Sequence, residues 1–368
     1  SHQELRQHLE EYAQRHQLHN QIHFRCSILA IEPTNTTNPH TGSWLITWED
    51  NSSKKRVTEE FDRVVICNGH YSAPYYPTIP GLTNFRGTVL HSNQYRNNKA
   101  FKGKTVVLHG NGASAADIGM EIAVVASQVH QCKRLDSAAP FKYKAKGITS
   151  QGNIIEVKEN GNLLLEDDTE LENADVLIFC TGFHYEFPFL DLERCQIQLE
   201  YKRVCGLLYH IFPFTPCHPH YYSDSEDAIQ PPTIAFVGLP WKVIPFPLFD
   251  VQARYVSSVW SGSTMLPCAA EIRMIMQEEI EFQESANLPA HYLHCLGVSQ
   301  FVYCRKLLDL AGFPELRSLI DKNRAIGIAT KYVRLAHPHY KDFTLKIQQN
   351  GKWKYFPPES GSHEIVQT

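Results

Sequence analysis

A short apolar segment, a glycine-rich turn and a helical segment follow one another, and this order constrains the fold more than any other feature. Thr105–His109 has the length and composition of a buried strand, and Ala113–Ala126 has helical periodicity. Val129–Cys132 is the next apolar segment, so the stretch predicts a βαβ unit with a right-handed crossover. We therefore expect a parallel sheet in this region.

The residue types within the turn, Gly110-Asn111-Gly112-Ala113-Ser114, predict a phosphate site. Gly110 permits a tight turn, and Gly112 lets the backbone approach a pyrophosphate at the helix N-terminus, where N–H groups and the helix dipole favour anions. Ser114 can add a hydroxyl group. The alternative is a glycine turn without a ligand, but the order of strand, turn and helix favours a bound dinucleotide.

Two cations directly after the next strand indicate which dinucleotide would bind. NAD sites usually carry an acidic residue there for the ribose hydroxyls, whereas NADP sites carry a basic one. Lys133 and Arg134 follow Cys132 here, and two cations can bind a 2′-phosphate. The alternative is a solvated Lys–Arg pair without a ligand.

Further apolar segments alternate with helical patterns along the chain. Asp62–Cys67, Asp175–Cys180 and Thr233–Val237 have the composition of buried strands, so we expect a doubly wound α/β architecture. A chain of 368 residues exceeds the usual size of a single core, which favours two structural units. The segment from Gly103 to about Ala174 is interpreted as an insertion in a larger domain.

Charge and hydropathy argue against two classes of partner. The formal net charge is −4, so we expect no nucleic-acid partner and no attraction to an anionic membrane. We find no uninterrupted apolar run long enough for a transmembrane helix, which needs about 18 residues, and no signal peptide. These features predict a cytoplasmic protein, for which peripheral association with the endoplasmic reticulum stays open.

Cysteine and histidine patterns do not predict a metal or a redox site. The ten cysteines form no C-x-x-C pair, so we expect reduced thiols rather than zinc ligands or a redox dithiol. Two His-Pro-His-Tyr stretches, His218–Tyr221 and His337–Tyr340, lack acidic or cysteine companions at ligand spacing. We interpret both as exposed loops and expect no metal.

One pattern before the glycine-rich turn resembles a known family. Phe85–Tyr95 fits F-x-G-x-x-x-H-x-x-x-Y, the identifying sequence of flavin-containing monooxygenases. Cys67–Tyr71 resembles that family's A-T-G-H-Y stretch, and Cys180–Phe183 resembles its C-T-G-Y motif. The resemblance is greatest to the plant glucosinolate S-oxygenase-like and fungal branch, whereas Tyr95-Arg96 argues against a Baeyer–Villiger enzyme.

The resemblance implies two doubly wound, Rossmann-like domains that bind FAD and NADP. The expected parts are an FAD-binding segment over 1–100, an inserted NADP-binding domain over 101–174 and a second FAD-binding segment over 175–368. In the family an N-terminal βαβ unit carries the FAD-binding G-x-G-x-x-G loop. The first glycine here is Gly42, so we expect the FAD-binding domain to lack that unit.

The activity implied by the resemblance is NADPH- and O2-dependent oxygenation of a soft N or S atom through a flavin C4a-hydroperoxide. The substrate would be a small amine or thioether, and a homodimer is compatible with the family. Two alternatives remain: a non-catalytic NADP-binding fragment unable to hold FAD, and another flavin enzyme such as a disulfide reductase, which the absent dithiol disfavours.

The resemblance also assigns residues to the cofactors FAD and NADPH. Those expected to bind NADP are Gly110, Asn111, Gly112, Ala113, Ser114, Lys133 and Arg134. Those expected to line the FAD and interdomain cleft are Gly69, His70, Tyr71, Gly182, Gly238 and Leu239. Phe85–Tyr95 would link the two domains, with His91 near the nicotinamide as a hinge residue rather than a general base.

Overall fold

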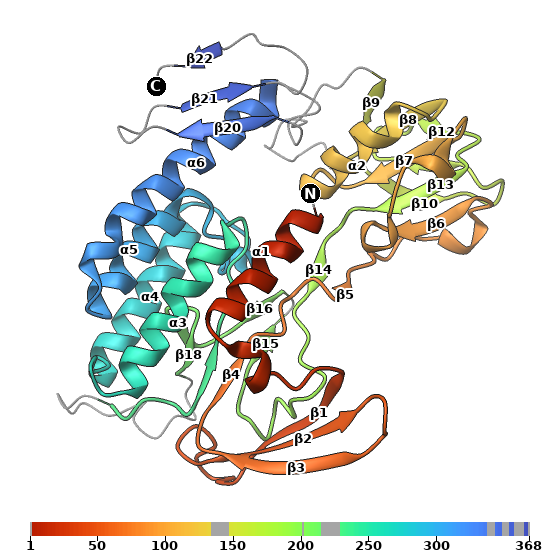
Figure 1. Ribbon diagram of the computed structural model, residues 1–368. Coiled ribbons are helices and arrows are strands. Elements are labelled where there is room, and N and C mark those ends of the chain that lie inside the picture. The colour runs from red at the N-terminus through yellow and green to blue at the C-terminus, as the bar shows by residue number, and fades with distance from the viewer. Residues whose placement is uncertain are drawn as a thin grey trace. The chain divides into compact units, whose positions relative to one another are not determined.

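The computed structural model describes residues 2–133, 147–200, 202–214, 229–336, 343–347, 353–356 and 364–366. The chain divides into two compact units (Figure 1). Unit 1 comprises Ser1–Asn68, Phe187–Val237 and Val256–Leu293, and unit 2 comprises Gly69–Glu186, Gly238–Tyr255 and His294–Thr368. Each unit is described by itself below.

A five-stranded parallel sheet forms the centre of unit 2. Its strand order is β6-β13-β7-β8-β9, and every neighbouring pair is parallel. The strands are β6 (Thr88–His91), β7 (Thr105–His109), β8 (Gln128–Cys132), β9 (Ile148–Gln151) and β13 (Val176–Phe179). Helix α2 (Ala113–Ala123) connects β7 to β8, so the predicted βαβ unit and the α/β fold class are confirmed.

Both faces of this sheet are buried because successive side chains of a strand point to opposite faces. On one face, Val106 and Leu108 of β7 pack with Ile118 and Ile122 of α2. On the other face, Val107 packs with three short antiparallel strands. These strands are β10 (Ile154–Val157), β11 (Leu163–Leu165) and β12 (Glu170–Leu171).

The segment Phe85–Tyr95 is not only a linker, and this part of the prediction is corrected. Its residues Thr88–His91 form β6, the edge strand of the sheet, with Val89 opposite Leu177. A four-residue strand at a sheet edge carries too few alternating positions to be recognised in the sequence. Because β6 and β13 lie outside 101–174, the sheet takes strands from both sides of that segment. The three-part division of the chain stays a prediction.

Unit 1 contains an antiparallel sheet and a separate parallel pair. The sheet order is β1 (Cys26–Pro33), β2 (Trp44–Asp50) and β3 (Arg56–Phe61). Strands β4 (Val64–Ile66) and β19 (Ile234–Phe236) form the parallel pair. Trp44 is fully buried, and its indole N–H donates to the Thr233 hydroxyl over 2.9 Å.

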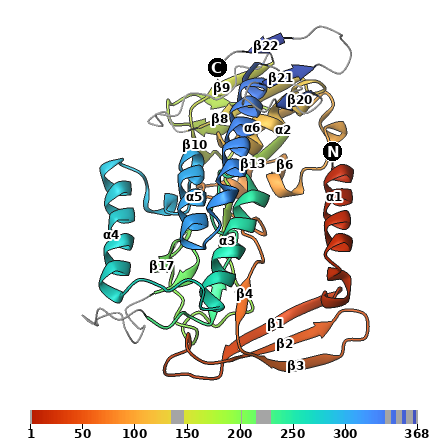
Figure 2. The same ribbon diagram turned by 60° about the vertical axis from the view of Figure 1, so that its left-hand side comes forward.

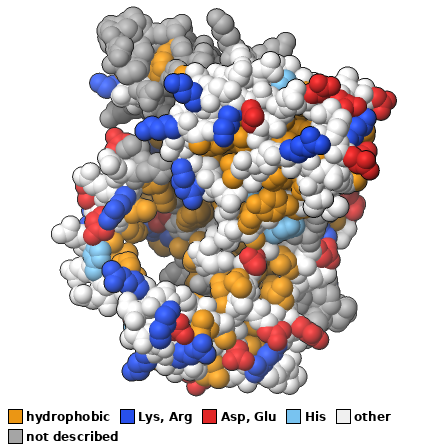
Figure 3. Space-filling view, turned by 90° about the vertical axis from the view of Figure 1, so that its right-hand side faces the viewer, with side chains coloured by type: hydrophobic (Ala, Val, Ile, Leu, Met, Phe, Trp, Pro, Cys, Tyr) orange, Lys and Arg blue, Asp and Glu red, His pale blue; other side chains and the backbone are white. Residues whose placement is uncertain are grey.

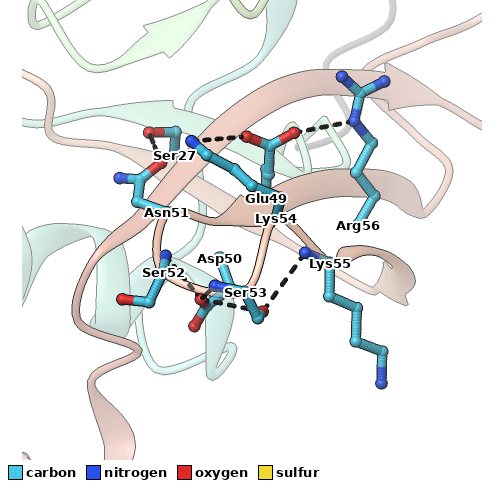
Figure 4. Close-up of polar contacts among 9 residues, drawn as sticks. All are labelled: Ser27, Glu49, Asp50, Asn51, Ser52, Ser53, Lys54, Lys55 and Arg56. Carbon is cyan, nitrogen blue, oxygen red and sulfur yellow. Dashed lines mark hydrogen bonds and ion pairs between the residues drawn. The ribbon is translucent and has the colours of Figure 1, made fainter.

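The β2–β3 turn is held by two neighbouring carboxylates (Figure 4). Asp50 accepts hydrogen bonds from the backbone N–H groups of Ser52 and Ser53, at 2.9 and 2.7 Å. Glu49 pairs with Lys54 at 3.4 Å and with Arg56 at 3.1 Å. An Asx-type turn of this kind sets the pairing of the two strands. These hydrogen bonds and the opposite charges lower the pKa of both carboxyl groups.

Most helices lie in the second half of the chain, apart from α1 (His2–Arg15) and α2. They are α3 (Pro245–Trp260), α4 (Ala269–Ser285), α5 (Gln300–Leu310) and α6 (Arg317–Ala336). In unit 2, α5 and α6 lie side by side (Figure 2), joined by an ion pair between Arg305 and Asp321. Trp353 and Tyr355 pack on the end of α6 in a small separate core.

Short elements complete the described part of the chain. The strands are β5 (Ala73–Pro74), β14 (Phe183–His184), β15 (Leu199–Glu200), β16 (Arg203–Val204), β17 (Leu207–Leu208), β18 (Phe212–Pro213), β20 (Thr344–Ile347), β21 (Trp353–Phe356) and β22 (Glu364–Val366). The 3-10 helices are Leu18–Gln21, Leu82–Asn84, Ser92–Gln94, Lys99–Phe101, Ala290–Tyr292, Gly297–Ser299 and Pro314–Leu316. On the face drawn in Figure 3, acidic and basic side chains are interspersed.

Candidate dinucleotide-binding site

The turn after β7 has the backbone geometry that a phosphate group requires. Gly110 has a φ of +132°, and a Cβ atom there would meet the Cys180 carbonyl oxygen at 2.5 Å, so this position needs glycine. Gly112 is exposed, and no atom lies within 4 Å of the place a Cβ would take. Among the described residues, no side chain caps the N-terminus of α2. Its N–H groups therefore fit a pyrophosphate.

Small side chains let α2 approach the sheet closely. Ala115 and Ala116 are both buried, in the place where a third glycine is common in such turns. At Gly119, a Cβ atom would come within 2.9 Å of the Leu108 side chain. Ala113 and Ser114 are exposed at the first turn of the helix, as a ligand-facing position requires. The substitution of alanine for the third glycine is thus compatible with close packing.

The cations predicted for the 2′-phosphate follow β8. Lys133 is half-buried, and its backbone N–H donates to the Gln151 carbonyl over 3.2 Å. Lys133 comes one residue after Cys132, which is opposite His109 in the parallel register. Lys133 therefore lies at the same edge of the sheet as the turn Gly110–Ser114, which we call the phosphate turn. Arg134 lies outside the described residues.

Gln131 is a site residue that the sequence interpretation missed. Its side chain is buried on β8, and its amide nitrogen donates to the Gly110 carbonyl and to Asn111 Oδ1, each over 3.2 Å. The available signal was a glutamine in a strand whose other inward residue, Val129, is apolar. Polar residues at such positions require a hydrogen-bonding partner, and here the partner is the turn itself.

The structure gives a physical reason for each fixed position of the Phe85–Tyr95 pattern. Phe85 packs against the buried cluster on the hairpin face of the sheet. A Cβ atom at Gly87 would meet the Asp175 carbonyl oxygen at 2.3 Å, so this close approach needs glycine. The Tyr95 hydroxyl donates to Glu121 of α2 over 2.9 Å. The residues of this pattern therefore hold strand β6 and helix α2 against the same sheet.

His91 is fully buried at the carboxyl end of β6. Its Nε2 lies 3.0 Å from the Gly182 carbonyl oxygen, and its Nδ1 accepts from the Asn93 backbone N–H over 3.3 Å. A carbonyl oxygen only accepts, so Nε2 carries a proton. Both nitrogens thus have partners in the protein, which favours a structural role over that of a general base.

His109 is a second buried histidine at this edge, and no pattern pointed to it. It precedes Gly110 directly, is 8% exposed and packs edge-on against Phe179 at 5.6 Å between ring centroids. Its Nδ1 has no hydrogen-bond partner among the described residues. Burial lowers the pKa of His109 to about 4, so the imidazole is neutral at pH 7.

Within unit 2, the residues assigned to FAD lie in one network although they are far apart in the sequence. The His70 ring lies 5.1 Å from that of Tyr185, whose hydroxyl donates to the Leu239 carbonyl over 2.6 Å. The Gly238 N–H donates to the buried side chain of Gln252 over 2.9 Å. The Gln252 amide then donates to the Tyr303 hydroxyl over 2.8 Å.

The histidine of this network offers ring nitrogens to which a polar ligand group can hydrogen-bond. Both ring nitrogens of His70 are buried without a hydrogen-bond partner among the described residues. Burial lowers the pKa of His70, so the ring is neutral at pH 7. Gly69 has a φ of +75° and an open Cβ position, whereas Tyr71 is exposed. The Gly182 carbonyl accepts a hydrogen bond from His91 Nε2. These features fit part of a flavin.

Two thiols, those of Cys132 and Cys180, directly follow or end strands of the parallel sheet. The nine cysteines that the structure describes are all free. Burial raises the pKa of Cys132 and of Cys180 to about 12, so both remain protonated at neutral pH.

Neither a three-residue metal cluster nor a helix able to span a membrane is found among the described residues. Within the described ranges, no three His, Cys, Asp or Glu side chains are grouped as a metal site would require. The stretches His218–Tyr221 and His337–Tyr340 lie outside these ranges. Of the helices that are described, none combines the length and the apolar character needed to span a bilayer.

Comparisons with known proteins agree with this geometry. The model of the family described as flavin-binding monooxygenase-like matches residues 1–139 and 135–354. The chain is 30% identical over 345 residues to an Arabidopsis thaliana protein named flavin-containing monooxygenase FMO GS-OX-like 4, covering 93% of this chain and 72% of that protein. It is 31% identical over 330 residues to FMO GS-OX4 of the same plant, covering 89% and 67%.

Solved structures give the same result. The S-allyl-L-cysteine S-oxygenase from Allium sativum superposes with a TM-score of 0.74 at 27% identity, covering 93% of this chain and 73% of that one. Tmm from a Pelagibacter strain, at 21% identity, shares the fold with a TM-score of 0.70 over 95% and 71% of the chains. The chain therefore belongs to the flavin-binding monooxygenase-like family, whose members are oxidoreductases that use FAD and NADPH.

Proposed function

We propose that this protein uses NADPH and O2 to oxygenate a soft nucleophilic sulfur or nitrogen atom of a small molecule. The observation that carries the proposal is the uncapped helix N-terminus behind Gly110 and Gly112, in a chain that matches a flavin monooxygenase family over most of its length. One atom of O2 goes to the substrate and the other leaves as water, while NADPH and a proton supply two electrons and two hydrogens.

A thioether is the first substrate class to test. The garlic structure at 27% identity is that of an S-allyl-L-cysteine S-oxygenase, which acts on a sulfur atom by its name. An amine is the second class. No paired-carboxylate motif stands out in the sequence. This suits a reaction in which a soft nucleophile is oxygenated without activation by the protein.

The protein's own residues would bind and orient the cofactors. The N–H groups of Gly112 to Ser114 would hold the pyrophosphate of NADPH, and Lys133 with Arg134 would pair with its 2′-phosphate. Bound FAD supplies the electron transfer and oxygen chemistry that amino-acid side chains lack. The neutral His70 would meet a polar group of the flavin with a nitrogen that has no described protein partner.

Three further features belong to the proposal. His91 would hold the Gly182 backbone in place near the nicotinamide. The free thiols support a reducing, cytoplasmic compartment. Association with a second copy of the chain or with the endoplasmic reticulum stays a prediction.

The alternative function is a nucleotide-binding module without catalysis. It is not favoured, because the family match continues to residue 354, well beyond the phosphate turn. A disulfide reductase is also disfavoured, since the sequence contains no C-x-x-C dithiol.

The test combines flavin binding with substrate oxidation. Purified protein is titrated with FAD, and its absorbance and flavin fluorescence are followed. NADPH consumption, O2 uptake and product are then measured with a thioether and with a tertiary amine. We expect flavin uptake and a sulfoxide formed in proportion to the NADPH consumed. Protein that binds NADPH but takes up no FAD would instead identify the non-catalytic module.

A further inference from the structure

Gln131 lies beneath the phosphate turn on the α2 side of the sheet. It shares that side of β8 with Val129, because side chains two residues apart in a strand point the same way. Val129 packs into the apolar cluster under α2, whereas the Gln131 side chain is 3% exposed and ends at the turn. A buried amide is costly unless it is hydrogen-bonded, so its contacts explain its presence.

The two contacts determine which way both amides face. The Gly110 carbonyl can only accept, so the Gln131 atom 3.2 Å away must be the amide nitrogen. The same nitrogen lies 3.2 Å from the Asn111 side chain, which must therefore present its oxygen. This places the amide nitrogen of Asn111 on the side away from Gln131. One buried amide thus orients the carbonyl of Gly110 and the side chain of Asn111 together.

Both backbone groups of Gly110, its N–H and its carbonyl, are hydrogen-bonded to strand β8. Its N–H donates to the Cys132 carbonyl over 2.9 Å, and its carbonyl accepts from Gln131, so two consecutive residues of β8 hold one glycine. The next residues, Asn111 and Gly112, lead directly to the uncapped N–H groups of α2. A turn fixed in this way loses less conformational freedom when a ligand binds.

We propose that Gln131 is a positioning residue that presets the Gly110–Asn111 turn for the pyrophosphate of a dinucleotide without touching the ligand. The proposal rests on the dinucleotide site proposed above. Because NADPH and NADH share the pyrophosphate, loss of Gln131 weakens both to the same extent. This separates Gln131 from Lys133, whose loss weakens NADPH selectively.

The experiment measures equilibrium binding of NADPH and NADH to wild type, Gln131→Leu and Lys133→Ala by calorimetric titration. Gln128→Leu is the matched control, since Gln128 is exposed on the same strand and lies opposite Thr105, at the end away from the turn. We expect Gln131→Leu to weaken both nucleotides about tenfold, the value of two lost hydrogen bonds. We expect Lys133→Ala to weaken NADPH alone and Gln128→Leu to change neither.

A double-mutant cycle tests the same idea independently of folding yield. Asn111→Ala removes one acceptor of the Gln131 amide, so its effect on NADPH affinity and that of Gln131→Leu should be non-additive. If Gln131→Leu does not fold, Gln131→Glu replaces it, because a carboxylate cannot donate to the Gly110 carbonyl. The kcat of Gln131→Leu at saturating NADPH should stay within about twofold of that of wild type.

Different results would contradict the proposed function and the positioning role. Wild-type protein that binds neither nucleotide contradicts the proposed function itself. Wild-type protein that binds NADPH, with unchanged affinity in Gln131→Leu or with a loss confined to NADPH, contradicts the positioning role alone. Strict additivity of Asn111→Ala and Gln131→Leu contradicts it as well.

Discussion

Two regions of unit 2 each place a histidine next to a glycine at positive φ, yet they are built differently. In the phosphate turn, His109 and Gly110 are consecutive, and the residues proposed to contact the pyrophosphate lie between β7 and the first turn of α2. The second region, which we call the flavin network, contains Gly69, His70, Gly182, Gly238 and Leu239. These residues come from distant parts of the chain. The first site is a local motif, whereas the second exists only after folding.

This difference predicts how mutations affect each region. The phosphate turn depends on a steric requirement at one glycine, because Gly110 lies against the Cys180 carbonyl. The flavin network depends on side chains that join separate segments, such as Gln252 and Tyr185. Damage to the turn should therefore affect one strand–helix junction, and damage to the network should loosen contacts between segments.

The largest effect is expected for Gly110→Ala. The new Cβ would clash with the Cys180 carbonyl at a φ that L-residues rarely adopt, so we expect a loss of about 3 kcal/mol in unfolding free energy. Urea denaturation measures this loss, and nucleotide titration should show no binding. The control is Gly103→Ala, at a φ of +70° with open space, which should cost about 1 kcal/mol. Equal losses at the two glycines would contradict the steric argument.

A smaller effect is expected for Gln252→Leu in the flavin network. The substitution leaves the Gly238 N–H and the Tyr303 hydroxyl without their partner, which should cost about 2 kcal/mol. Flavin retention after gel filtration should fall, while NADPH affinity should stay near that of wild type. A parallel loss of NADPH affinity would show that the two regions are not independent.

The smallest effect is a pH dependence that distinguishes the two histidines. The pKa of His109 falls from the ordinary 6.5 to about 4 on folding, so the unfolded chain binds more protons between these values. Stability should therefore decrease as the pH falls below about 6.5, with about 1 kcal/mol from His109 between about pH 7 and pH 5.5. Below about pH 4 this contribution stops changing, because both states are protonated.

The measurement is the unfolding free energy of wild type, His109→Phe and His70→Phe across this pH range. His109→Phe should flatten the curve more than His70→Phe, since burial lowers both pKa values but His109 is more deeply buried than His70. A steeper curve in His109→Phe than in wild type would contradict a buried, neutral His109.

The regular elements with a strong local signal could be predicted closely. The strand Thr105–His109 and the start of α2 at Ala113 were both expected, and glycine at 110 has the predicted steric role. The edge strand β6 was missed because its four residues show no clear alternation, and its pairing with β13 depends on a segment more than 80 residues away. Helix α3 begins at Pro245, earlier than its apolar periodicity suggests, since proline is tolerated in a first helical turn.

By itself, the sequence determined the phosphate turn, the order of its strands and helix, and the family pattern from Phe85 to Tyr95. Each of these depends on neighbouring residues, whose geometry follows from local backbone chemistry. Only the tertiary structure decided that Gln131 reaches under Gly110, that His109 is buried without a partner for Nδ1, and that His70 lies beside Tyr185. The physical reason is that hydrogen bonding and desolvation depend on which distant segments meet, and no spacing along the chain encodes such a contact.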